Sequence, residues 1–277
     1  MSTISRSLEV ARSNIYERLV AAIKPRKRRR ESRLDDEWLL PMIQQIISWR
    51  PTYGYRRVTT LICRELRAQG KPTVNAKRIQ RIMSENGLSL ERHTARPTRS
   101  HHGKVITLRS NVRWCSDGFR IQCWNGDRLE IAFSLDCHDR EVIRWIASNK
   151  GIDGQTVRDL MAETMESRFP NVTALPYNVQ WLSDNGPGYT ADETVRFGRA
   201  IGLDVCTTAP YSPESNGMAE AFVKTFKRDY VAFGDLSSAA KVLEQLPKWF
   251  EDYNELAPHK GLAMKSPREY LRQYQHA

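Results

Sequence analysis

The chain contains 277 residues with a mass of 32.0 kDa, which is long enough for two domains, one of them with a sizeable hydrophobic core. Its five cysteines are odd in number and widely spaced without a C-x-x-C pair, which argues against a disulfide framework. No apolar run reaches about 18 residues and the start lacks a signal-peptide pattern, so we expect a soluble, cytoplasmic protein without a membrane partner.

The charge is unevenly distributed along the chain, whose formal net charge is +11. Residues 1–113 contain 25 Lys and Arg against 9 Asp and Glu, a net of +16, whereas residues 114–277 contain 18 against 23, a net of −5. A charge of this size indicates a polyanion-binding module in the first part, with DNA phosphates as its partner. The alternative is a basic surface that serves solubility alone, which needs less charge.

Residues 1–34 are predicted to form a short helical piece followed by a basic linker. The linker contains Lys24-Pro25-Arg26-Lys27-Arg28-Arg29-Arg30. Such a run is either solvated or an arm that contacts phosphates.

Residues 35–93 are predicted to form a compact helical domain. Helical apolar spacing runs from Trp38 to Ile47 and again from Tyr55 to Ala68, and Asn75 is a suitable N-cap for a third helix closed by Gly87. This pattern favours a helix-turn-helix-like domain, and residues 94–112 are predicted to form a linker.

The third helix of this domain carries Lys77, Arg78 and Arg81 on its outward face. That face suits a recognition helix that enters a DNA groove. The alternative is a three-helix bundle whose basic face has no function.

From residue 113 onward the pattern changes to strands. Strands are predicted at 114–122, 129–135, 142–147, 179–183 and 204–208, and helices at 153–168, 190–201 and 215–230. Three strands followed by alternating helices and strands predict an α/β fold, a ribonuclease-H-like mixed sheet with flanking helices. We assign residues 113–277 to this catalytic core and its C-terminal helical tail.

Three acidic residues fall on elements of that sheet and its helices. Asp117 lies on the first strand, Asp184 directly follows the fourth, and Glu220 lies one turn into the last helix, with 35 residues between it and Asp184. Gathered at one end of a sheet, three carboxylates can hold two hard divalent cations, Mg²⁺ or Mn²⁺, for phosphoryl transfer. The serines beside the acids, Ser116 and Ser183, are interpreted as turn and cap groups rather than nucleophiles.

The helix of Glu220 has a polar stripe formed by Asn216, Glu220, Lys224 and Lys227. We expect Asn216, Lys224 and Lys227 to contact DNA beside the carboxylates. The alternative is a solvated face with an i,i+4 Glu–Lys pair.

The motifs around these residues resemble those of DDE transposases of bacterial insertion sequences, of the OrfB type with a retroviral-integrase-like core. The similarity rests on Trp114 to Asp117, Ser183-Asp184-Asn185-Gly186, Ser212 to Glu220, and the tail from Tyr253-Asn254 to Tyr270. It extends from about residue 35 to the end of the chain.

The resemblance implies that Asp117, Asp184 and Glu220 are the catalytic, metal-binding triad, and that Lys227 matches the family's basic residue seven places after the glutamate. It also implies a helix-turn-helix region around Arg56 and Arg57, which would contact DNA.

The implied function is metal-dependent cleavage at the terminal inverted repeats of an element and strand transfer into target DNA. The implied partners are double-stranded DNA, further copies of the chain on that DNA, and an upstream-frame protein or fusion, near the bacterial nucleoid. Two alternatives remain open: a non-catalytic helix-turn-helix regulator, and a ribonuclease-H-like nuclease or junction resolvase.

Overall fold

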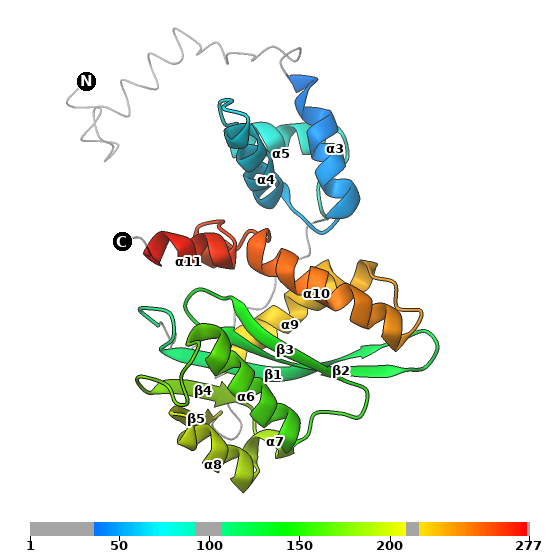
Figure 1. Ribbon diagram of the computed structural model, residues 1–277. Coiled ribbons are helices and arrows are strands. Elements are labelled where there is room, and N and C mark those ends of the chain that lie inside the picture. The colour runs from blue at the N-terminus through cyan, green and yellow to red at the C-terminus, as the bar shows by residue number, and fades with distance from the viewer. Residues whose placement is uncertain (1–35, 92–106, 209–215, 276–277) are drawn as a thin grey trace, which may run out of the picture.

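A computed structural model describes residues 36–91, 107–208 and 216–275. A helical unit precedes an α/β unit in the chain and lies at one end of the molecule (Figure 1). The helical piece and basic run predicted within residues 1–34 lie outside the described residues, as does most of the predicted linker at 94–112. Within the described ranges, no helix is long and apolar enough to cross a membrane.

The helical unit consists of α3 (Leu39–Trp49), α4 (Tyr55–Ala68) and α5 (Ala76–Glu85), which share one hydrophobic core. The three predicted helices are thus confirmed. Asn75 caps α5, because its side chain accepts a hydrogen bond from the backbone N–H of Lys77 at 2.9 Å. Pro41 is tolerated in α3 because it lies in the first turn, where backbone N–H groups have no helical acceptor.

The α/β unit is built on a mixed five-stranded sheet. Its strands are β1 (Arg113–Gln122), β2 (Arg128–Asp136), β3 (Val142–Ser148), β4 (Val179–Ser183) and β5 (Leu203–Thr207). The strand order is β3-β2-β1-β4-β5; β1 pairs antiparallel with β2 and parallel with β4. The three antiparallel strands and the two that follow in parallel confirm the predicted ribonuclease-H-like sheet.

Helices cover both faces of the sheet (Figure 1). One face packs against α6 (Gly154–Arg168), α7 (Pro187–Thr190) and α8 (Asp192–Ala200), and the other against α9 (Gly217–Asp229) and α10 (Ala239–Glu255). Alternation along β1 separates the two cores, because Cys115 and Phe119 face α9 and α10 whereas Trp114 packs in the opposite cluster.

The helix expected at 190–201 is confirmed as α8, and a short helix that was not predicted, α7, precedes it. Ala191 separates the two helices with extended backbone angles, φ −56° and ψ 133°. A short 3-10 helix at 231–233 lies between α9 and α10, and a second at 260–262 lies between α10 and α11 (Pro267–Gln275), the last described helix.

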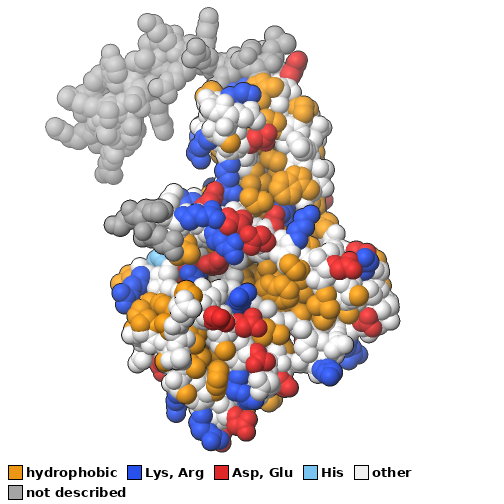
Figure 2. Space-filling model, viewed as in Figure 1, with side chains coloured by type: hydrophobic (Ala, Val, Ile, Leu, Met, Phe, Trp, Pro, Cys, Tyr) orange, Lys and Arg blue, Asp and Glu red, His pale blue; other side chains and the backbone are white. Residues whose placement is uncertain are grey.

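The helical unit contacts the last helices of the α/β unit directly. Asp229 at the end of α9 accepts hydrogen bonds from Thr52 at 2.6 Å and Arg57 at 2.8 Å. On the same side Arg64 donates to the backbone oxygen of Leu256 at 2.7 Å. Figure 2 shows acidic and basic side chains intermixed on the surface below the helical unit. Arg268 and Arg272 of α11 form ion pairs with acidic residues of α10.

Candidate active site

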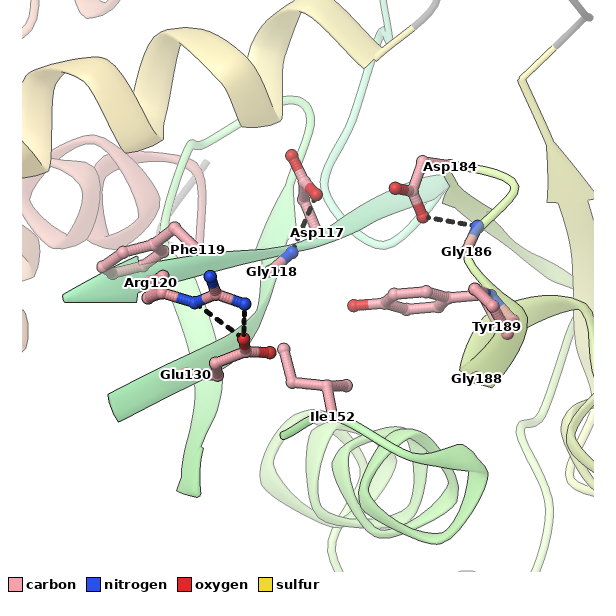
Figure 3. Close-up of a pocket in the computed structure, with 11 residues that line it drawn as sticks. Asp117, Gly118, Phe119, Arg120, Glu130, Ile152, Asp184, Gly186, Gly188 and Tyr189 are labelled. Carbon is pink, nitrogen blue, oxygen red and sulfur yellow. Dashed lines mark hydrogen bonds and ion pairs between the residues drawn. The ribbon is translucent and has the colours of Figure 1, made fainter. Parts of the chain in front are cut away.

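Asp117 on β1 and Asp184, directly after β4, lie at the same level of two neighbouring parallel strands. Cys115 on β1 pairs with Leu182 on β4, and each acidic residue follows two positions later. Both carboxylates therefore line one open pocket of about 310 Å³, together with Gly118, Gly186 and Tyr189 (Figure 3). Open α/β sheets bind their ligands at this end of parallel strands.

Asp117 is half-buried, and one of its carboxylate oxygens accepts a hydrogen bond from the backbone N–H of Gly118 at 2.7 Å. The pKa of Asp117 is raised to about 6, mainly by burial and also by the carboxylates of Asp184 and Glu220, which together outweigh the effect of that hydrogen bond. Asp184 and Glu220 are therefore close enough to Asp117 for their charges to act on its carboxylate.

Asp184 is exposed in the loop between β4 and α7. Its Oδ1 accepts a hydrogen bond from the backbone N–H of Gly186 at 3.1 Å, which fixes the start of the turn. Gly186 has little room for a side chain, since a Cβ there would lie 3.1 Å from that same oxygen.

Glu220 lies in the first turn of α9 and is exposed, but it does not line the pocket. Across the part of the chain that the structure describes, no group of three His, Cys, Asp or Glu side chains is arranged to hold a metal ion as it stands. The structure thus brings two of the predicted acidic residues into one pocket and leaves the third nearby, on the adjacent helix.

The residues predicted to contact DNA in the helical unit have different surroundings. Lys77 and Arg56 are exposed, and the Arg56 guanidinium lies 5.7 Å from the ring centroid of Tyr55. Arg78 and Arg81 bind Asp36, the former at 2.6 Å, and Arg57 binds Asp229. A role of these arginines in DNA contact stays a prediction.

Asn216 is placed differently from our prediction of an exposed DNA contact. It precedes the first residue of α9, so the helical period that predicted the polar stripe does not apply to it. Only 6% of the residue is exposed, and its side-chain Nδ2 donates a hydrogen bond to the backbone oxygen of Ser116 at 3.3 Å.

Lys224 and Lys227 are exposed on α9, as the stripe predicts. The Lys227 ammonium lies 5.7 Å from the ring centroid of Phe119, a residue that lines the pocket. Lys227 therefore stands beside the rim of the site.

Ser116 and Tyr189 have a structural role that was not predicted from the sequence. Ser116 is fully buried in the middle of β1 instead of forming a turn or cap, and its hydroxyl lies 3.1 Å from that of Tyr189. A polar residue at an inward position of a strand requires a hydrogen-bonding partner. The serine at such a position of the predicted strand was therefore the signal that could have indicated a buried hydrogen bond.

Comparison with known proteins identifies the class of protein to which this fold and site correspond. A family model described as an integrase core domain matches residues 108–213, a second integrase core model matches 202–267, and an HTH-like domain matches 33–96. Transposase InsD for insertion element IS2A/D/F/H/I/K of Escherichia coli is 46% identical over 276 residues, which cover 99% of this chain and 91% of that relative. Transposase InsD for insertion element IS2-9 of Escherichia coli (strain K12) is also 46% identical and is covered to 89%.

Solved structures with a similar arrangement include the catalytic core domain of BIV integrase and the catalytic domain of Mos1 mariner transposase. The first has a TM-score of 0.44 and 19% sequence identity, and the match covers 60% of this chain and 97% of that chain. The second has a TM-score of 0.43 and 18% identity, with 60% and 76% covered.

The chain belongs to the DDE transposase family, which confirms the predicted resemblance. It is accordingly an enzyme of DNA transposition, a DDE polynucleotidyl transferase that acts on DNA. The two alternatives, a non-catalytic regulator and a nuclease or resolvase, are not favoured by this membership.

Proposed function

We propose that Asp117, Asp184 and Glu220 form the catalytic triad with which this transposase cleaves the ends of its element and joins them to target DNA. The main support is the raised pKa of Asp117, which reflects burial together with the charges of Asp184 and Glu220. A carboxylate on β1 whose charge is opposed by one carboxylate just after β4 and another on α9 suits charge neutralisation by a cation.

Two Mg²⁺ or Mn²⁺ ions fit this set of oxygen ligands, with Asp117 and Asp184 in the pocket and Glu220 on the adjacent helix. When bound, such ions lower the pKa of the attacking water or 3′-hydroxyl and stabilise the leaving oxygen. The protein supplies two aligned strands, on which Asp117 and Asp184 each follow the paired residues Cys115 and Leu182 by two positions. It also supplies the pocket that admits the scissile phosphate.

The DNA is held by basic groups around the pocket and in the helical unit. Lys224 and Lys227 are exposed on the helix that carries Glu220, and Lys227 lies beside Phe119 at the rim. In the helical unit, Arg56 and Lys77 are the exposed basic residues suited to contact the terminal inverted repeats. Asn216 is omitted from this set because of its burial.

The roles of the domains follow from the uneven charge of the chain, which is strongly basic in residues 1–113 and mildly acidic in residues 114–277. Residues 35–93 recognise DNA, residues 113–277 cleave and join it, and residues 94–112 connect the two. Pairing two element ends requires a homo-oligomer assembled on DNA, and an upstream-frame protein can join that assembly as a partner or fusion.

The test is a strand-transfer assay with the purified chain, duplex oligonucleotides of the element ends, and a supercoiled target. The proposal predicts joined products in Mg²⁺ or Mn²⁺ and none in EDTA. Nicking that does not depend on the element ends, without joined products in the same assay, would contradict the proposal. It would indicate that the chain is a nuclease.

A further inference from the structure

Ser116 joins the two other segments that carry catalytic acidic residues to the strand of Asp117. It is fully buried on β1, directly before Asp117. Its side-chain oxygen lies 3.1 Å from the hydroxyl of Tyr189, and its backbone oxygen accepts a hydrogen bond from Asn216 at 3.3 Å. The side-chain oxygen of Ser116 thus contacts α7, and its backbone oxygen contacts the residue that precedes α9.

Tyr189 connects Ser116 to the turn of Asp184. The backbone N–H of Tyr189 donates to the oxygen of Gly186 at 3.0 Å, and the N–H of Gly186 donates to Asp184 Oδ1 at 3.1 Å. Figure 3 shows the Tyr189 side chain extending from α7 beside Asp117 and Asp184. A displacement of this ring therefore displaces the turn on which Asp184 lies.

Asn216 connects Ser116 to the helix of Glu220. It lies directly before Gly217, the first residue of α9, and Glu220 follows in the first turn. Because Asn216 is buried against β1, the start of this helix is held at the strand of Asp117. All three acidic segments therefore meet at one buried serine.

The hydrogen bond between the buried hydroxyl groups of Ser116 and Tyr189 is not needed for the stability of the fold. Tyr189 is 5% exposed and belongs to an apolar cluster that includes Trp114 and Trp181. Replacing both partners of a buried hydrogen bond by apolar groups of the same shape is nearly neutral for stability, so a Phe–Ala pair would fold as well. What the two hydroxyl groups add is a fixed position for the ring, and with it for the adjacent turn.

We infer that Tyr189 and Ser116 are positioning residues, whose hydrogen bond holds the turn of Asp184 in register with Asp117 so that both can bind a divalent cation. This inference rests on the proposed catalytic triad. Neither hydroxyl group touches the reacting phosphate in this role; each acts through the carboxylates.

The test uses the full-length chain with Tyr189→Phe, Ser116→Ala and the double variant. Tyr177→Phe is the matched control, since Tyr177 is exposed and outside the pocket. Three quantities are measured: the Mn²⁺ dissociation constant by electron paramagnetic resonance, the Mg²⁺ concentration for half-maximal strand transfer, and the melting temperature.

Each single variant is expected to weaken Mn²⁺ binding and raise the half-maximal Mg²⁺ concentration about tenfold, the scale of one lost hydrogen bond. The double variant should be no weaker than either single one, because both lose the same interaction. It should also melt close to the parent, which separates positioning from general destabilisation.

Parental Mn²⁺ affinity in Tyr189→Phe, or additive effects in the double variant, would overturn the inference. A lowered melting temperature with unchanged Mn²⁺ affinity would overturn it as well. Asp184→Asn, measured in parallel, separates this failure from failure of the triad: if it binds Mn²⁺ as the parent does, the triad is wrong. If Asp184→Asn loses Mn²⁺ and Tyr189→Phe does not, only the positioning role fails.

Discussion

The guanidinium Nη1 of Arg57 lies 2.8 Å from Oδ2 of Asp229, although 172 residues separate the two in the chain. Asp229 is the last residue of α9, the helix that carries Glu220 in its first turn. Burial works to raise the pKa of Asp229, but hydrogen bonds from Arg228 and Thr52 and the nearby guanidinium charges outweigh it, so the pKa is lowered. The helical unit is thus attached, through a buried carboxylate, to the helix that carries Glu220, a member of the proposed triad.

Asp229→Asn should lower the free energy of unfolding by about 3 kcal/mol, because it leaves Arg57 without its buried counter-charge. Since the folded pKa is depressed, this stabilisation is present above the unfolded pKa and disappears as the pH falls below about 4. Urea unfolding at pH 7 and pH 3 measures both effects. Exposed Asp159→Asn is the control, and equal stability of the two variants at pH 7 would refute the role of Asp229.

Arg56→Ala and Lys77→Ala should each reduce the salt dependence of binding to element-end DNA. Both side chains are exposed, and each phosphate contact contributes about 0.9 to the slope of log K against log salt concentration. Arg57→Ala should lower stability instead, because Asp229 holds that side chain. If the slope of log K against log salt concentration is unchanged in both Arg56→Ala and Lys77→Ala, these two residues are not part of the DNA-binding surface.

Lys227→Ala should slow cleavage at saturating DNA while leaving DNA affinity nearly unchanged. Its ammonium lies beside Phe119 at the rim of the pocket, where it can hold the terminal phosphate near Asp117. Lys241→Ala is the control, since Lys241 is exposed on α10 and pairs with Glu244. Equal cleavage rates in the two variants and the parent would show that Lys227 is a surface lysine without a role in cleavage.

His259 should make the fold sensitive to acid. It is buried, and burial lowers its pKa to about 3, with the charges of Arg57 and Arg140 acting in the same direction and that of Asp229 opposing them. The unfolded chain therefore binds a proton below pH 6.5 that the folded chain excludes, so stability falls as the pH drops from 6.5 toward 3.

Between pH 7 and pH 5 this loss amounts to about 2 kcal/mol at most. His259→Gln should remove that part of the pH dependence, which urea unfolding at the two pH values would reveal. A parent and variant that lose the same stability over this interval would show that His259 is not the responsible group.

Local pattern was sufficient for most elements of this fold and for placing the three acidic residues on or next to them. The strand pattern at 114–122 and the helical periods of α4, α5 and α9 predicted these elements to within a few residues, because each is amphipathic or bounded by turn residues. The short helix α7 was missed, since its four residues are too few to show a helical period.

Contacts between distant residues could not be predicted in the same way. Neither the pairing of Arg57 with Asp229 nor that of Ser116 with Tyr189 leaves a trace in local periodicity. The burial of Asn216 likewise depends on how α9 meets β1, which is set by tertiary packing.

The most direct measurement of the central claim is strand transfer by Asp184→Asn, compared with exposed Asp204→Asn on β5 and with DNA binding by both. Removing a metal-binding carboxylate should reduce strand transfer by more than about a hundredfold, the upper range for losing even an indirect metal contact. DNA affinity should stay within about twofold of the parent, because the change removes one negative charge from the site. Substantial strand transfer by Asp184→Asn, at the level of Asp204→Asn, would contradict the assignment of the triad.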